Sequence, residues 1–120
     1  MASETRVNGT SGTAGWAVRT LGGAATLSLS GEIDMAAVGG VAPGLAVKLL
    51  EAVDGAACVT CDLAEVGFMD SSGIHLLVKL RDEVVGTGRD FRLLRPGEQI
   101  GRIFDIVGAG SLFEIVEPSA

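Results

Sequence analysis

The clearest chemical signal in this chain is a pair of hydroxyl groups, Ser71 and Ser72, which follow Asp70 and precede Gly73. An apolar run ends shortly before them, and a helical pattern begins with them. A serine at a helix start can be exposed, and it lies at the positive end of the helix dipole, which favours a negative group. The pattern suits a phosphorylation site that switches a binding surface. It also fits an ordinary helix start.

Two cysteines, Cys58 and Cys61, have the C-x-x-C spacing of a redox pair or half a zinc site. They lie in residues 56–63, an apolar run that we expect to form a buried strand. Residues three apart in a strand point to opposite faces, so the two thiols should diverge. The sequence has no second cysteine or histidine pair to complete a zinc site. We therefore expect two core cysteines, no metal and no other cofactor.

The serine pair does not match known catalytic patterns. The G-x-S-x-G sequence of a nucleophile elbow is absent around Ser71 and Ser72. The single histidine, His75, lies three residues after Ser72 on the same expected helix, a poor position for a base that a third group must orient. Asp62 could end a central strand as in a receiver domain, but the acidic pair after the first strand is missing. A P-loop is also absent. We predict that the protein is not an enzyme.

Composition limits the remaining classes. At 120 residues, with 48% hydrophobic residues, the chain fits one packed domain. Its formal net charge is −6, and its only basic cluster is Arg89, Arg92 and Arg95, so neither nucleic acid nor an anionic membrane is an expected partner. No apolar run reaches the roughly 18 residues of a membrane span, and residues 1–15 lack the apolar segment of a signal peptide. We expect a cytoplasmic protein.

The segments before the serines should form strands and one helix. Residues 1–15 are polar and rich in Gly, Ser and Thr, so we expect a disordered N-terminal tail. Strands over 16–21 and 24–30 flank a Gly-Gly hairpin signal. A loop that contains Gly39, Gly40 and Pro43 should follow. The next helix is indicated by the spacing of Leu45, Leu49, Leu50 and Val53.

The helix that begins at the serines is expected over residues 71 to about 85, with Asp70 as N-cap. Its broad apolar face should contain Ile74, Leu77, Leu80, Val84 and Val85, and its narrow polar face His75, Lys79, Asp82 and Glu83. Ser72 falls on the polar side, so we expect it to be better exposed than Ser71. Gly73 has two open explanations, the close approach of a partner or an unusual backbone angle.

The remaining residues complete an alternating pattern. A short strand over residues 91–95 stops at Pro96, a helix with apolar positions at 100, 103, 104 and 107 ends at Gly108, and a last strand covers 112–116 before a tail over 117–120. The order ββαβαβαβ predicts an α/β fold, with a central mixed sheet and helices packed on it. Strands joined through helices should be parallel, and the first two antiparallel.

Several motifs, taken together in their order and spacing along the chain, resemble the STAS domain and, more narrowly, the bacterial anti-sigma factor antagonists. The motifs are Gly31-Glu-Ile-Asp34, Asp62-Leu63, residues 68–74, Pro96, Ile103-Phe104, Gly108 and Leu112-Phe113. The resemblance covers about residues 16–116 and implies a STAS-like single domain there.

The resemblance implies a switch. Members of the family bind an anti-sigma factor that is itself an ATP-dependent serine kinase, and so free a sigma factor for transcription. The kinase phosphorylates the serine before the motif glycine, which is Ser72 here, with Ser71 as second candidate; a serine phosphatase restores binding. We expect the partner surface to include Asp34, Asp70, Ser71, Gly73, His75 and Lys79.

One departure from the family concerns the loop before the first helix. Relatives commonly place a proline closer to the residue that matches Asp34, whereas Pro43 follows it by nine residues. We therefore expect a longer loop beside the binding face, with a bearing on partner choice. The alternative function is a STAS scaffold subunit of a signalling or lipid-transport assembly that is never phosphorylated.

Overall fold

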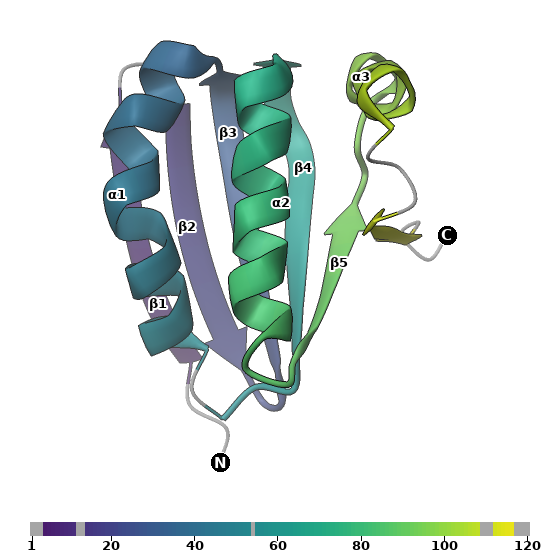
Figure 1. Ribbon diagram of the computed structural model, residues 1–120. Helices are drawn as coiled ribbons and strands as arrows, with labels where there is room; N and C mark the ends of the chain where they lie inside the picture. Colours follow the sequence, from purple (N-terminus) through teal and green to yellow (C-terminus); the bar gives the residue numbers. More distant parts are fainter. Residues whose placement is uncertain (1–3, 12–13, 54, 109–111, 117–120) are drawn as a thin grey trace.

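The computed structural model describes residues 4–11, 14–53, 55–108 and 112–116. The strands are β1 (Glu4–Ser11), β2 (Ala14–Leu21), β3 (Ala24–Ile33), β4 (Cys58–Met69), β5 (Asp90–Leu94) and β6 (Glu114–Val116), and the helices are α1 (Met35–Ala52), α2 (Ser71–Val85) and α3 (Glu98–Val107). The six strands form one sheet in sequence order. Helices α1 and α2 lie side by side on one face of it, and α3 lies beyond β5 (Figure 1).

The sheet is mixed, as predicted. β1, β2 and β3 pair antiparallel, and β3, β4, β5 and β6 pair parallel. Parallel neighbours need a crossover, and here the helices supply it. The carboxyl ends of β3 and β4 and the first turns of α1 and α2 therefore meet at one edge of the sheet (Figure 1).

The N-terminal segment contradicts the disordered tail expected over residues 1–15, because Glu4–Ser11 forms β1 and pairs with β2. Gly9 lies opposite Trp16, and a Cβ on Gly9 would come within 2.6 Å of the Trp16 indole Nε1. Glycine at this position lets the indole lie against the strand. Pairing with β2, not apolar alternation within residues 1–15, explains the strand. The tail expected over 117–120 lies outside the described residues.

Helix α1 begins at Met35, so the loop expected around Gly39, Gly40 and Pro43 is wrong. Asp34 caps the helix, with its Oδ1 accepting the N–H of Ala37 at 2.9 Å. The helix then continues through two glycines and a proline, although Pro43 has no N–H to donate to the preceding turn. The same helix later buries Leu45 and Leu49 completely, and this burial outweighs the poor local helix propensity.

Strand β4 is longer than expected, because it runs without a loop from Cys58 to Met69. Its register against β3 shifts between Ser28 and Ser30. Near the shift, the Asp62 carboxylate accepts a hydrogen bond from the N–H of Ala64 at 2.9 Å and forms an ion pair with Arg95. Asp62 therefore lies within the strand, not at its end, and stabilises an irregular part of it.

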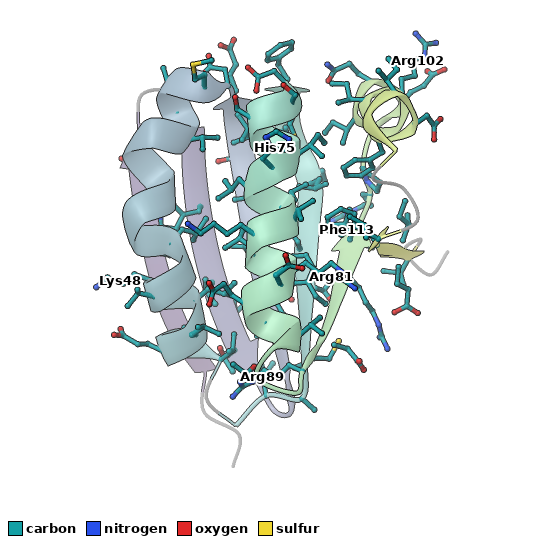
Figure 2. All side chains as sticks on the ribbon, in the orientation of Figure 1. Lys48, His75, Arg81, Arg89, Arg102 and Phe113 are labelled. Atoms are coloured by element: carbon teal, nitrogen blue, oxygen red, sulfur yellow. The ribbon has the colours of Figure 1, made fainter. Side chains whose placement is uncertain are left out.

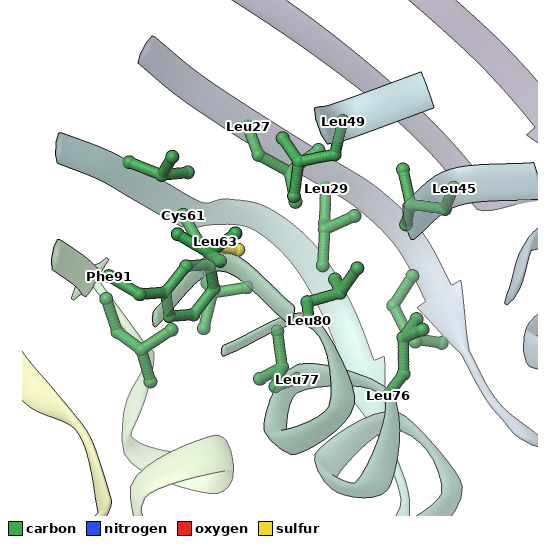
Figure 3. Close-up of a cluster of buried hydrophobic side chains, with 14 of the residues drawn as sticks. Leu27, Leu29, Leu45, Leu49, Cys61, Leu63, Leu76, Leu77, Leu80 and Phe91 are labelled. Carbon is green, nitrogen blue, oxygen red and sulfur yellow. The ribbon is translucent and has the colours of Figure 1, made fainter. Parts of the chain in front are cut away.

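The two cysteines point to opposite faces of β4, as predicted, but only one of them belongs to the core. Cys61 is fully buried among leucines (Figure 3), and this burial raises the pKa of its thiol. Cys58 is half-buried. The expectation of two core cysteines is therefore wrong for Cys58, which lies on the face of β4 that α1 and α2 do not cover.

The core lies between the sheet and the pair α1 and α2. Its largest members include Leu27, Leu29, Leu45, Leu49, Leu63, Leu77 and Leu80 (Figure 3). Next to α3, Phe113, the residue before β6, stacks on Phe104 of that helix with ring centroids 5.4 Å apart. This contact attaches the last strand to α3. Helix α3 ends at Gly108 as expected. Within the described ranges, no helix has the length and apolar character needed to cross a membrane.

Candidate functional site

Strands β3 and β4 end side by side, and each is followed by an aspartate that caps a helix. Ile33 pairs with Met69 in register, and the N–H of Asp70 donates to the carbonyl of Ile33 at 3.3 Å. Asp34 begins α1 and Asp70 begins α2. The two helix starts are therefore neighbours at the carboxyl edge of the parallel strands, the edge where open α/β sheets bind ligands.

Asp70 organises the first turn of α2. Its Oδ1 accepts the N–H of Ser72 at 2.9 Å and the N–H of Gly73 at 3.3 Å. This confirms the predicted N-cap. Because the carboxylate already takes these two donors, the start of α2 is not an open anion site, and any function here depends on the side chains around it.

The two serines have the reverse of the expected exposure: Ser71 is exposed and Ser72 is half-buried. Ser72 lies one turn before Leu76, which is only 4% exposed because α1 packs along that flank of α2 (Figure 1). Ser71 lies one turn before His75, which is exposed. The helical period of α2 alone could not reveal this difference, since a second helix causes it.

Gly73 has an internal explanation that the sequence did not suggest. A Cβ at this position would lie 2.4 Å from Cγ of Met69 and 2.9 Å from the carbonyl oxygen of Ile33. Its φ is not in the left-handed region. An unusual backbone angle is therefore wrong as the explanation for Gly73. The residue is buried where α2 lies close to the end of β3, and its expected contact with a partner stays a prediction.

The polar residues predicted on α2 are where they were expected. His75 and Lys79 are exposed, together with Asp82 and Glu83 (His75 is labelled in Figure 2). The apolar face differs at two positions, because Leu76 is buried and Val85 is 42% exposed. The structure thus brings Asp34, Asp70 and both serines together at the sheet edge, while His75 and Lys79 continue down α2.

Two exposed apolar residues beside the serines were missed by the sequence reasoning. Met35, the first residue of α1, is 74% exposed, and Phe68, next to the end of β4, is 43% exposed. Phe68 pairs in register with Glu32 of β3. Alternation with the buried Met69 could have identified Phe68, had residues 64–69 been recognised as strand.

The site suits contact with a protein. It combines accessible hydroxyl groups, two capping carboxylates and exposed apolar side chains on one edge of the sheet. Among the described residues, no group of three metal-ligating side chains is close enough to hold a metal ion.

Comparison with known sequences identifies the family of this chain. The STAS domain model matches residues 15–119. The anti-sigma-B factor antagonist of Bacillus subtilis is 30% identical over 89 residues, 74% of this chain and 78% of the relative. The anti-sigma-B factor antagonist of Staphylococcus epidermidis is 36% identical over 59 residues, 49% of this chain and 55% of the relative. That second match spans only about half the relative's length.

Comparison with solved structures gives the same fold. The anti-sigma factor antagonist SpoIIAA in its unphosphorylated form superimposes with a TM-score of 0.68 at 19% identity, covering 87% of this chain and 88% of SpoIIAA. The phosphorylated form of Bacillus SpoIIAA gives a TM-score of 0.64 at 19% identity, covering 87% and 91%. The predicted α/β architecture is thus confirmed as that of a solved STAS protein.

Proposed function

We propose that this chain, which belongs to the STAS domain family, is an anti-sigma factor antagonist that phosphorylation of Ser72 switches off. The observation that carries the proposal is the position of Ser71 and Ser72 in the first turn of α2, at a sheet edge with exposed apolar side chains. The names of the curated relatives support the same function.

The partner in this proposal is an anti-sigma factor that is also a serine kinase. Binding of the unphosphorylated chain to this partner frees a sigma factor for transcription. Transfer of a phosphoryl group from ATP to the serine hydroxyl abolishes the complex, and a serine phosphatase restores it by hydrolysis. In this scheme Asp34, His75 and Lys79 contribute to the partner surface, and Asp70 holds the serines in place.

The physical argument is that a phosphate affects binding far more than folding. A phosphoserine carries roughly −1.5 to −2 charges at neutral pH. Near a helix start such a charge is tolerated or favourable by about 0.3–1 kcal/mol, here towards the lower end because Asp70 occupies the donors. Buried against a partner without a cation, it costs about 3–5 kcal/mol, or a factor on the order of 10²–10⁴ in affinity.

The choice between the two serines follows from the family motif and from the flank of α2 on which each lies. Ser72 precedes the motif glycine and lies nearer α1 than Ser71 does, so a phosphate on Ser72 would add charge beside both capping aspartates. Ser71 is the more accessible hydroxyl and is the second candidate.

Phosphosite mapping by mass spectrometry tests the proposal on protein purified from its own host, in growth and under stress. We expect a single phosphate on Ser72 whose occupancy changes with condition. The matched variant Ser72→Ala should lose that phosphopeptide. A phosphate on Ser71 would correct the site and keep the mechanism. No phosphate in any condition would contradict the switch and favour the scaffold function.

A further inference from the structure

Helix α3 contacts the start of α2 through the side chain of Gln99. α3 lies at the same end of the sheet as the first turn of α2 (Figure 1), and it contacts both α2 and β4. Ile100 and Phe104 are buried and attach α3 to the core. Gln99 is exposed and does not belong to this buried face. Its side-chain Nε2 nevertheless donates to the carbonyl of Met69 at 3.3 Å, although the two residues are 30 apart in the sequence.

The Met69 carbonyl belongs to the peptide group that leads into the N-cap of α2. The N–H of the same peptide group, which is that of Asp70, donates to the carbonyl of Ile33 at 3.3 Å. A trans peptide group directs its C=O and its N–H to opposite sides. The group is therefore held by β3 on one side and by Gln99 of α3 on the other.

Packing holds the Met69 side chain but not the rotation of this peptide group. The side chain is fully buried and lies against Gly73 of α2. Contact of this kind fixes the side chain and the Cα atom, whereas the peptide group can still turn about the line between its two flanking Cα atoms. Hydrogen bonds on both sides of the group oppose that rotation. Gln99 therefore contributes an orientation that the core by itself does not supply.

The orientation of the peptide group acts on the serines through Asp70. Rotation of the group changes φ of Asp70, which is −103° in the structure, and so changes the direction of the Asp70 side chain. The Oδ1 of that side chain accepts the N–H groups of Ser72 and Gly73. Gln99 is thus connected to the first turn of α2 through the peptide group and the N-cap.

We propose that Gln99 is a positioning residue for the switch, which presents the Ser72 hydroxyl to the kinase in one orientation by fixing the Met69–Asp70 peptide group. This inference rests on the proposed function. In the transfer, the Ser72 oxygen forms a bond to the γ-phosphorus of ATP, the bond to ADP breaks, and the hydroxyl proton passes to a base of the kinase. The step requires in-line alignment of the hydroxyl, so a loosely held turn slows the transfer more than it weakens binding.

Single-turnover phosphorylation of the full chain tests the inference. The probe is each purified host anti-sigma factor of the serine kinase class, assayed singly with ATP. Gln99→Met keeps a chain of similar length without a donor, and we expect its maximal rate constant to fall about fivefold while the half-saturating concentration changes little. Gln99→Lys keeps a donor and should recover most of the rate. Arg102→Met, which removes an exposed side chain of the same helix, should react as the natural chain does.

Amide hydrogen exchange, measured by NMR on the chain alone, separates positioning from stability. In Gln99→Met we expect the N–H groups of Ser72 and Gly73, which Asp70 accepts, to exchange about fivefold faster. The N–H of Leu80, in the middle of α2, should exchange as in the natural chain, and the melting temperature should change little. Faster exchange along all of α2 would show that Gln99 only stabilises the fold, and would overturn the inference.

The outcomes distinguish this inference from the proposed function. If no kinase-class anti-sigma factor phosphorylates the natural chain, both fail. If the natural chain is phosphorylated on Ser72 and Gln99→Met reacts equally fast, only the role of Gln99 is wrong. A higher half-saturating concentration with an unchanged maximal rate constant would also overturn it, since Gln99 would then contact the partner directly.

Discussion

Helices α1 and α2 begin in the same way but present different surfaces. Each follows a strand whose last residue is buried, Ile33 before α1 and Met69 before α2, and each is capped by an aspartate. Both bury leucines in the same core (Figure 3). Their outward faces differ, since α2 carries serines followed by charged residues and α1 has no charge before Lys48. The sheet thus fixes where the helices lie, while the outward residues are free to differ in function.

The glycines near the two helix starts should give the largest difference in stability. Gly73→Ala forces a Cβ against the backbone of Ile33 and should lower the free energy of unfolding by about 1–3 kcal/mol. Gly39→Ala, in open space on α1, should raise it by about 0.5–1 kcal/mol. Urea denaturation of both variants measures these changes. Changes of the same sign in the two variants would contradict the distinction between Gly73, whose neighbours leave no room for a Cβ, and Gly39, whose surroundings are open.

The two N-caps should differ by a smaller amount. Asp70 accepts two backbone N–H groups, whereas the one bond found for Asp34 is from Ala37. We expect Asp70→Ala to lower the free energy of unfolding by about 1–2 kcal/mol and Asp34→Ala by about 0.5–1 kcal/mol. Denaturant titration at neutral pH checks the order. The variants Asp70→Asn and Asp34→Asn, which keep a capping oxygen, serve as controls and should recover most of the loss. A larger loss for Asp34→Ala than for Asp70→Ala would contradict the greater stabilisation expected from the Asp70 cap.

The C-terminal ends of the helices should show the smallest effect. The buried hydroxyl of Thr20 donates to the Ala52 carbonyl at the end of α1, at 2.6 Å. The exposed Thr87 donates to the Val84 carbonyl at the end of α2, also at 2.6 Å. Thr20→Val should lower the free energy of unfolding by about 1 kcal/mol, and Thr87→Val by less than about 0.5 kcal/mol. Thermal unfolding detects the difference, with Thr20→Ser as the control that keeps the hydroxyl; equal losses would disprove it.

Much of the fold could be predicted from local sequence signals. The helix from Ser71, its cap Asp70 and the end of α3 at Gly108 all carry residues whose chemistry acts over a few positions. The mixed sheet, with parallel pairing of the strands joined through helices, followed from the alternation of these elements. These features depend on hydrogen bonds within one turn or on apolar spacing within one element, so one segment is enough to predict them.

The predictions that proved wrong share one cause, because each of these features depends on contacts between segments that are distant in the sequence. β1 exists because β2 pairs with it, and α1 persists through Pro43 because Leu45 and Leu49 are buried against the sheet. Ser72 is half-buried because α1 covers the flank of α2 on which Leu76 lies. The period of a single helix contains no information about the helix beside it.

The most direct test of the account is the affinity of the kinase-class anti-sigma factor for the full chain with and without phosphate on Ser72. Calorimetry with both purified proteins, in the absence of ATP, gives the two dissociation constants, and thermal unfolding reports the fold of each form. We predict that phosphate weakens binding by a factor on the order of 10²–10⁴ while the melting temperature changes little. Equal affinity of the two forms, or unfolding of the phosphorylated one, would contradict a switch that acts through the partner surface.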